Sequence, residues 1–152
     1  MKTIRISLLA ATCLAVLSTA LAASAPSKTI VITANDSLRF SVTSITAEPG
    51  QTLHVQFHNV GNLPKDVMGH NWILLKADQD PEAYAAMAVG AKADNFEPKA
   101  LSGQVLASVP LLGPGETGDV TFTAPMKPGT YPFLCSFPAH YAAGMRGVLV
   151  VE

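Results

Sequence analysis

The chain has 152 residues, of which 49% are hydrophobic and 14% are charged, and its formal net charge at pH 7 is −1. This near-neutral charge argues against a nucleic-acid partner, which requires a basic surface. The length suits one domain with one hydrophobic core.

The N-terminal segment predicts a secretory signal peptide. Two cations precede an apolar run over residues 8–17, and small residues follow it. Cleavage after Ala22 satisfies the requirement for small residues before the cut, so we expect a signal peptide over residues 1–22 and a mature domain over residues 23–152. The apolar run is shorter than the roughly 20 residues that a membrane span requires. We therefore expect a periplasmic protein with no membrane span in its mature form.

The cysteine content of the mature chain is unusual for an exported protein. Removal of residues 1–22 takes away Lys2 and Arg5, which changes the formal charge from −1 to −3, and leaves Cys135 as the single cysteine. In an oxidising compartment such a cysteine is buried, bound to a metal or paired with another molecule.

Short apolar or alternating segments, separated by turn residues, recur along the mature chain and are typical of an all-β protein. In one of them, Leu53, Val55 and Phe57 share a face, and the residues between them point to the other side. We expect a Greek-key β-sandwich or barrel of about eight strands. The expected strands are residues 28–33, 38–45, 52–60, 70–76, 104–109, 117–124, 129–137 and 146–152.

Residues 78–96 depart from this pattern and predict a short helical insertion between two strands. Asp80 is a suitable N-cap, Pro81 suits the first helical position, and Gly90 is near the end. We expect a helix of about two to three turns, with Met87 as a packing residue.

The segment CSFPAHYAAGM, residues 135–145, spaces a cysteine, a histidine and a methionine at intervals of five residues. Cys135 ends one predicted strand and Met145 precedes another, so a loop joins them. The proline in this loop excludes a helix, and the glycine permits a tight return. Cys135, His140 and Met145 can therefore meet at one point. Thiolate, imidazole and thioether are ligand types of a blue-copper site, which also requires a second histidine.

His70 is the candidate for that second histidine, because it lies where a loop enters a predicted strand. A Greek-key sandwich can bring such a position beside the final hairpin. His54 and His58 are alternatives, but both lie on the polar side of their strand, so we expect them to be surface residues.

Two segments together resemble the cupredoxins, or type 1 blue-copper proteins, and azurin and auracyanin in particular. One is GNLPKDVMGHNWIL, which contains His70; the other is GPGETGDVTFTAP followed by YPFLCSFPAH, which contains Cys135. The similarity spans most of the mature chain. It implies one type 1 copper ion bound by His70, Cys135 and His140, with Met145 as a distant axial ligand.

The same resemblance implies roles for the two neighbours of the first histidine. The carbonyl of Gly69 would be a weak axial contact, and Asn71 would brace the cysteine sulfur and its loop through hydrogen bonds. The chain departs from azurins in two ways. Its methionine follows the loop histidine by five residues rather than four, a spacing closer to auracyanin, and its mature form lacks the azurin disulfide.

Such a ligand set suits both Cu(I) and Cu(II) and offers no open position for a substrate. We therefore expect a soluble electron-transfer protein that shuttles single electrons between redox partners and is not an enzyme. The resemblance implies a monomer whose partners are c-type cytochromes or a copper or haem oxidoreductase. The alternative is a periplasmic copper-binding or delivery protein, which predicts exchangeable copper near methionine- or histidine-rich tracts.

Small apolar residues of the cysteine–methionine loop, with one residue of the other ligand loop, predict an apolar collar around the edge of His140. In the family that the chain resembles, such a patch docks redox partners. The expected collar consists of Met68, Pro138, Ala139, Tyr141, Ala142 and Ala143.

Overall fold

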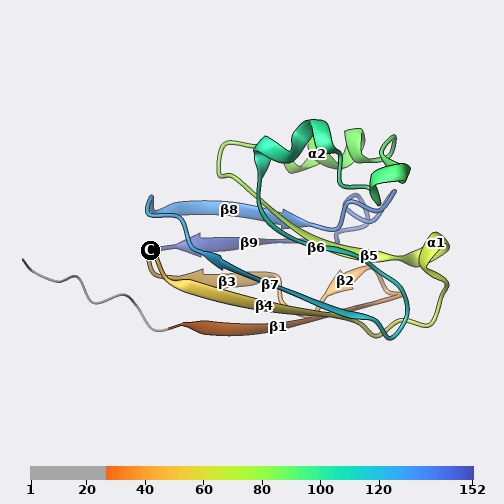
Figure 1. Ribbon diagram of the computed structural model, residues 1–152, viewed down its shortest axis with the longest axis horizontal. Helices are drawn as coiled ribbons and strands as arrows, with labels where there is room; N and C mark the ends of the chain where they lie inside the picture. The colour runs from red at the N-terminus through yellow and green to blue at the C-terminus, as the bar shows by residue number, and fades with distance from the viewer. Residues whose placement is uncertain (1–26) are drawn as a thin grey trace, which may run out of the picture.

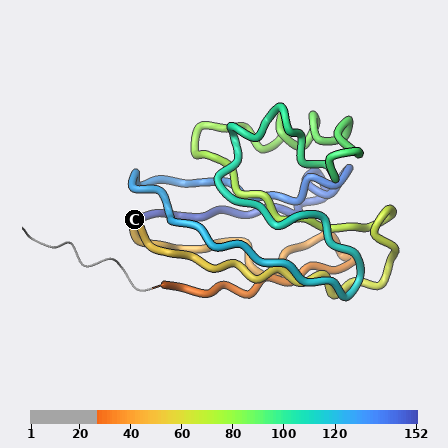
Figure 2. The backbone as a smooth tube through the Cα atoms, viewed as in Figure 1, coloured from red at the N-terminus to blue at the C-terminus, as the bar shows by residue number. Residues whose placement is uncertain are grey.

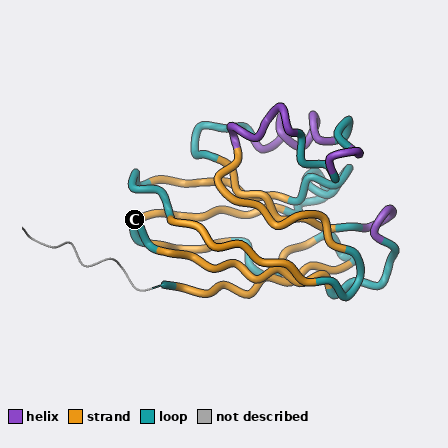
Figure 3. The backbone as a smooth tube through the Cα atoms, in the orientation of Figure 1, coloured by secondary structure: helices purple, strands orange, loops and turns teal. Residues whose placement is uncertain are grey.

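A computed structural model of the chain describes residues 27–152. The predicted signal peptide, residues 1–22, lies outside the described residues. Two β-sheets pack face to face (Figure 1), and the helical segments lie outside these two layers (Figure 3). The predicted all-β sandwich is therefore confirmed, but the two sheets do not close into a barrel.

The first sheet has the strand order β2-β1-β4-β7 and the second has the order β3-β9-β8-β5-β6. The β1–β4 and β3–β9 pairs are parallel, and the other pairs are antiparallel. The strands of the first sheet are β1 (Lys28–Asn35), β2 (Arg39–Phe40), β4 (Thr52–Asn59) and β7 (Thr117–Thr123). Those of the second are β3 (Ser44–Ala47), β5 (His70–Leu75), β6 (Val105–Leu112), β8 (Gly129–Leu134) and β9 (Arg146–Val151).

The prediction of one continuous strand over residues 38–45 is wrong. The chain forms β2 and then β3, which belong to different sheets. This change of sheet lets Phe40 and Ile45 both enter the core, where each is 4% exposed. The alternation of apolar residues predicted for β4 is confirmed, because Leu53, Val55 and Phe57 are all fully buried.

Every residue of β5 is buried. One face of β5 packs in the sandwich core, where the rings of Trp72 and Phe133 lie 5.5 Å apart between centroids. The other face carries Ile73 and Leu75, which cluster with Tyr84 of the helical insertion. Because β5 is covered on both sides, its sequence is continuously apolar after the first two residues.

The predicted helix is α2 (Pro81–Ala88), and the Asp80 carboxylate caps it by accepting the backbone N–H groups of Glu82 at 2.9 Å and Ala83 at 3.3 Å. Met87 is 59% exposed, so the prediction that it packs is wrong. Tyr84 and Ala88, one helical turn apart, occupy the buried face instead. The insertion continues, as the trace in Figure 2 shows, through the 3₁₀ helices η1 (Lys92–Asp94) and η2 (Lys99–Gln104).

A further short helix, α1 (Lys65–Met68), lies just before β5. Across residues 27–152, no helix combines the length and the apolar content that crossing a bilayer demands.

Candidate metal centre

Strand pairing brings the predicted ligands together. His70 is the first residue of β5, Cys135 follows the last residue of β8, and Met145 precedes β9. β8 is antiparallel to both β5 and β9. The start of β5, the end of β8 and the start of β9 therefore lie at the same end of the second sheet.

The side chains of His70, Cys135 and His140 converge at this end. The Nδ1 atoms of the two imidazoles are 3.2 Å apart, and the Cys135 sulfur lies 3.4 Å from Nδ1 of His140. The three ligand atoms all lie within 4.8 Å of one another. His70 and Cys135 are fully buried, and His140 is 3% exposed.

Met145 is tied to two of these residues through its backbone. Its N–H donates to the carbonyl of His140 at 3.0 Å, and its carbonyl accepts the N–H of Cys135 at 3.1 Å. The Met145 side chain is fully buried. The segment between Cys135 and Met145 is thus a closed, internally bonded loop, which we call the ligand loop (residues 136–144).

Asn71 anchors the start of the ligand loop. Its side-chain oxygen accepts the backbone N–H of Ser136 at 2.8 Å, and its side-chain nitrogen donates to the Ser136 hydroxyl at 2.8 Å. That hydroxyl donates in turn to the carbonyl of Phe96 at 2.5 Å. Sequence reasoning identified Asn71 but missed Ser136, although a serine beside the cysteine of an apolar loop is a signal for such a bond.

Aromatic side chains cover the site. The rings of Phe137 and His140 are 4.7 Å apart between centroids, and those of Phe96 and Phe137 are 4.9 Å apart. Phe96 comes from the helical insertion, so an element far away in sequence helps to exclude water from the imidazole. Sequence reasoning assigned no role to either phenylalanine.

Burial is the largest influence on the pKa values of His70, Cys135 and His140. It raises the pKa of the Cys135 thiol to about 12, against the opposing effect of the backbone N–H groups of Asn71 and Phe137. Burial, followed by the nearby His70, lowers the pKa of His140 to about 4. Burial also lowers the pKa of His70, although Asp36 opposes this. In the metal-free protein at pH 7, the site therefore holds a neutral thiol and neutral imidazoles.

For the metal-free protein, we expect the free energy of unfolding to be greatest between about pH 6.5 and pH 9. The pKa of His140 falls from 6.5 to about 4 on folding, so its contribution is complete above pH 6.5 and is lost as the pH falls toward 4. The pKa of the Cys135 thiol rises from 9.0 to about 12, so its contribution is complete below pH 9 and is lost as the pH rises.

Denaturant titrations of the metal-free protein at several pH values measure this effect. The loss attributable to His140 by pH 4 is on the order of 2–3 kcal/mol. Replacing His140 with glutamine should reduce the loss of stability at acidic pH and leave the part that comes from His70. A stability that is constant from pH 4 to pH 7 would contradict the prediction.

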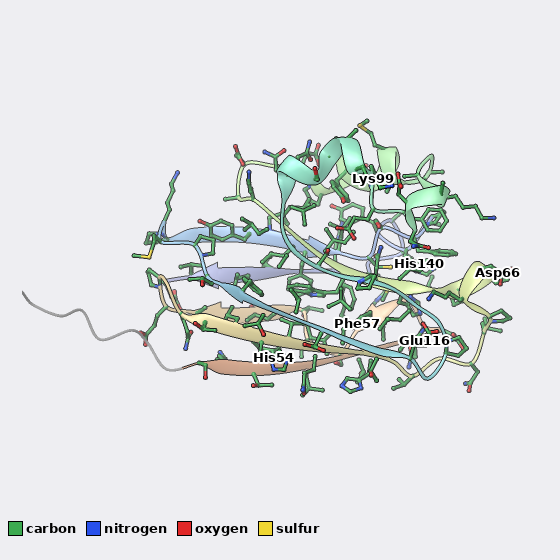
Figure 4. The ribbon with its side chains drawn as sticks, in the orientation of Figure 1. His54, Phe57, Asp66, Lys99, Glu116 and His140 are labelled. Carbon is green, nitrogen blue, oxygen red and sulfur yellow. The ribbon has the colours of Figure 1, made fainter. Side chains whose placement is uncertain are left out.

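The other two histidines lie outside this cluster. Both are half-buried on the outer side of β4, and Nε2 of His54 lies 3.2 Å from the carboxylate of Asp119. Figure 4 shows His54 and His140 in separate parts of the molecule. Among the described residues, the histidine–cysteine cluster contains only His70, Cys135 and His140.

The donor set fits copper. Atoms separated by 3.2 and 3.4 Å have the spacing of ligands that share one ion at about 2.0–2.3 Å from each. A thiolate with two imidazoles is the trigonal set of blue-copper sites. The buried His70 Nδ1, His140 Nδ1 and Cys135 sulfur all face one another, so a single ion could bind all three once the thiol has lost its proton.

Comparisons with known proteins agree with this chemistry. Residues 27–152 match a family model described as copper binding proteins, plastocyanin/azurin family. Auracyanin-B of Chloroflexus aurantiacus is 38% identical over 128 residues, a match that spans 83% of this chain and 53% of auracyanin-B. The chain thus spans about half of that relative. Azurin of Pseudomonas denitrificans is 37% identical over 124 residues, which span 80% of this chain and 95% of the azurin.

A solved structure shows the same fold. The crystal structure of dithionite-reduced auracyanin from Roseiflexus castenholzii superposes with a TM-score of 0.72 at 34% identity, and the match covers 86% of this chain and 99% of the auracyanin. The sequence family, the fold and the buried donors therefore point to the same cofactor, which is copper. The chain belongs to the plastocyanin/azurin family of copper-binding proteins.

Proposed function

We propose that this protein is a soluble, periplasmic blue-copper protein that transfers single electrons between redox partners. The observation that carries the proposal is the convergence of one thiol and two imidazoles in a site almost closed to water. In this proposal His70, Cys135 and His140 bind the ion, and Met145 is a distant axial ligand. Bound copper would supply a one-electron cycle between Cu(I) and Cu(II).

We propose that the carbonyl of Gly69 would be a further weak axial contact to the ion. The backbone around this residue is crowded, which supports a role for glycine here. A Cβ atom added at position 69 would lie 2.5 Å from the carbonyl of Lys65 and 3.0 Å from the side chain of Leu111. A larger residue would therefore displace the backbone that precedes His70.

The protein part of the proposed mechanism is to hold the donors still and to keep water away. Asn71 fixes the start of the ligand loop, and the backbone bonds of Met145 join its end to Cys135 and His140. A site that rearranges little on gaining or losing an electron suits outer-sphere transfer without bond-making catalysis. We therefore propose that the protein is not an enzyme.

The burial of the donors also favours electron transfer over the alternative of copper delivery. A delivery protein must let an acceptor reach the ion and exchange ligands with it. Here the thiol and the His70 ring are fully buried, and Phe137 packs on the remaining imidazole. This arrangement supports a retained ion.

We propose that redox partners dock on the apolar collar around His140. Its members are exposed or half-buried. A groove of about 420 Å³ adjoins it between α2 and the ligand loop, and Ala139, Tyr141 and Ala142 line its loop side. The proposed partners are c-type cytochromes or a copper or haem oxidoreductase, and the protein is proposed to act as a monomer. Transient redox complexes bury small areas, as such a collar would.

Replacing Ala142 with glutamate should slow electron exchange with a redox partner at least about tenfold, because a charge desolvated in an apolar contact is costly. The copper absorption spectrum should stay unchanged, because Ala142 is exposed and is not among the donors. Stopped-flow kinetics with a c-type cytochrome measure the rate. The matched control is Ala77→Glu, an exposed site beyond the far end of β5. Equal rates for both variants would contradict the docking proposal.

The function itself is tested by visible absorption and electron spin resonance of the copper-loaded protein before and after ascorbate. We expect an intense absorption band toward the red end of the spectrum and a narrow copper hyperfine splitting, both lost on reduction. A colourless protein that gives up Cu(I) to a chelator would instead support delivery.

A further inference from the structure

The ligand loop is held by a residue from the opposite sheet. Five loop carbonyls accept N–H groups from the loop or from the two residues that follow it, namely those of Phe137, Ala139, His140, Tyr141 and Gly144. The carbonyl of Ala143 is bound instead by the guanidinium of Arg39, a residue of β2. The same nitrogen of Arg39 also donates to the carbonyl of Leu38 at 2.8 Å.

The guanidinium also packs on the next loop residue. Gly144 has a φ of +102°, in the region that favours glycine, and a Cβ added to it would lie 3.2 Å from both Cζ and Nη1 of Arg39. Arg39 therefore contacts the loop at two consecutive residues, immediately before Met145. A larger residue at position 144 would push the end of the Arg39 side chain aside as well as straining the backbone.

Arg39 is itself held in place by the turn between β1 and β2. The side-chain oxygen of Asn35 accepts the N–H of Ser37 at 3.0 Å and its hydroxyl at 2.5 Å, and the N–H of Leu38 donates to the carbonyl of Asn35 at 3.1 Å. Leu38 has a φ of 59°, which a turn of this kind requires. The side chain of Arg39 thus leaves a fixed turn and reaches a loop 104 residues away.

We propose that Arg39 is a positioning residue of the metal centre, which fixes the Ala143–Gly144 end of the ligand loop and thereby the position of Met145. The proposal rests on the proposed ligand role of Met145. Met145 follows directly after the two residues that Arg39 contacts, and its backbone bonds to His140 and Cys135. Without the guanidinium, the Ala143–Gly144 end of the ligand loop can move, and this movement would displace Met145.

The first test uses the copper-free protein and the variants Arg39→Met, Arg39→Lys and Arg146→Met. Arg146 is the matched control, because it is also a cation beside the loop, but its guanidinium packs over the Tyr141 ring, 5.0 Å from the centroid. Hydrogen exchange of the Gly144 and Met145 amides should be about tenfold faster or more in Arg39→Met. Arg39→Lys should fall between Arg39→Met and the wild type, and Arg146→Met should accelerate the exchange of these two amides much less than Arg39→Met, because Arg146 contacts the loop only through the Tyr141 ring.

The second test is the copper hyperfine splitting and the reduction potential of the loaded variants. Arg39→Met should change the splitting, Arg39→Lys should partly restore it, and Arg146→Met should leave it unchanged. Unchanged amide exchange in Arg39→Met, or equal effects of Arg39→Met and Arg146→Met, would overturn the proposal. A reduction potential that changes with salt concentration while the hyperfine splitting stays constant would also overturn the proposal, because Arg39 would then act only through its charge. A wild type without a blue band would refute the proposed function, while the amide exchange would still test the contact.

Discussion

Replacing Cys135 with alanine is expected to abolish the intense visible absorption of the copper-loaded protein. The thiol is the only sulfur donor among the three converging groups, and its sulfur lies 3.4 Å from Nδ1 of His140. Copper bound by two imidazoles alone lacks the thiolate that gives a blue-copper site its character. We expect loss of the entire band, measured by absorption at matched copper occupancy.

The matched control is a histidine outside the cluster. Replacing His54 with alanine should leave the band unchanged, because its imidazole pairs with Asp119 on the outer side of the sandwich. A band that persists in Cys135→Ala would show that the colour comes from elsewhere, and the assignment of the site would be wrong.

Replacing Asn71 with alanine is expected to lower the free energy of unfolding by about 2–4 kcal/mol. The change removes two hydrogen bonds of 2.8 Å and leaves the backbone N–H of Ser136 buried without its acceptor. Ser136 is only 1% exposed, so water cannot replace the lost partner without local opening. Chemical denaturation of the copper-free protein measures the loss.

A double-mutant cycle with Ser136→Ala separates this contact from other effects of the substitution. The Asn71 amide and the Ser136 hydroxyl bond to each other, so the two changes should not be additive, and we expect a coupling of about 1 kcal/mol or more. Fully additive losses would show that Asn71 stabilises the protein by another route. Asn71→Ala should also broaden the electron spin resonance signal of the bound copper, because the start of the ligand loop is no longer held by Asn71.

Much of the fold could be predicted from local patterns. The alternation in β4 identified its buried face, and the Asp80–Pro81 pair identified the start of α2, because each signal acts over a few residues. Sequence patterns did not predict the break between β2 and β3. The chain changes sheets there because Phe40 and Ile45 both pack in the core, which only the folded structure shows. The exposure of Met87 was missed for a similar reason, because only the packed helix shows that Tyr84 and Ala88 face the sheet.

The sequence by itself determined the chemistry of the site, because the types and order of His70, Cys135, His140 and Met145 restrict the metal that they suit. Only the tertiary structure decided how these groups are held. Asn71 and Ser136 are 65 residues apart, and Arg39 lies 104 residues from Ala143. The Asn71–Ser136 contact forms only when β5 and β8 align in one sheet, and the Arg39–Ala143 contact forms only when the two sheets pack. Burial, which sets the pKa values of the thiol and the imidazoles, arises at that same step.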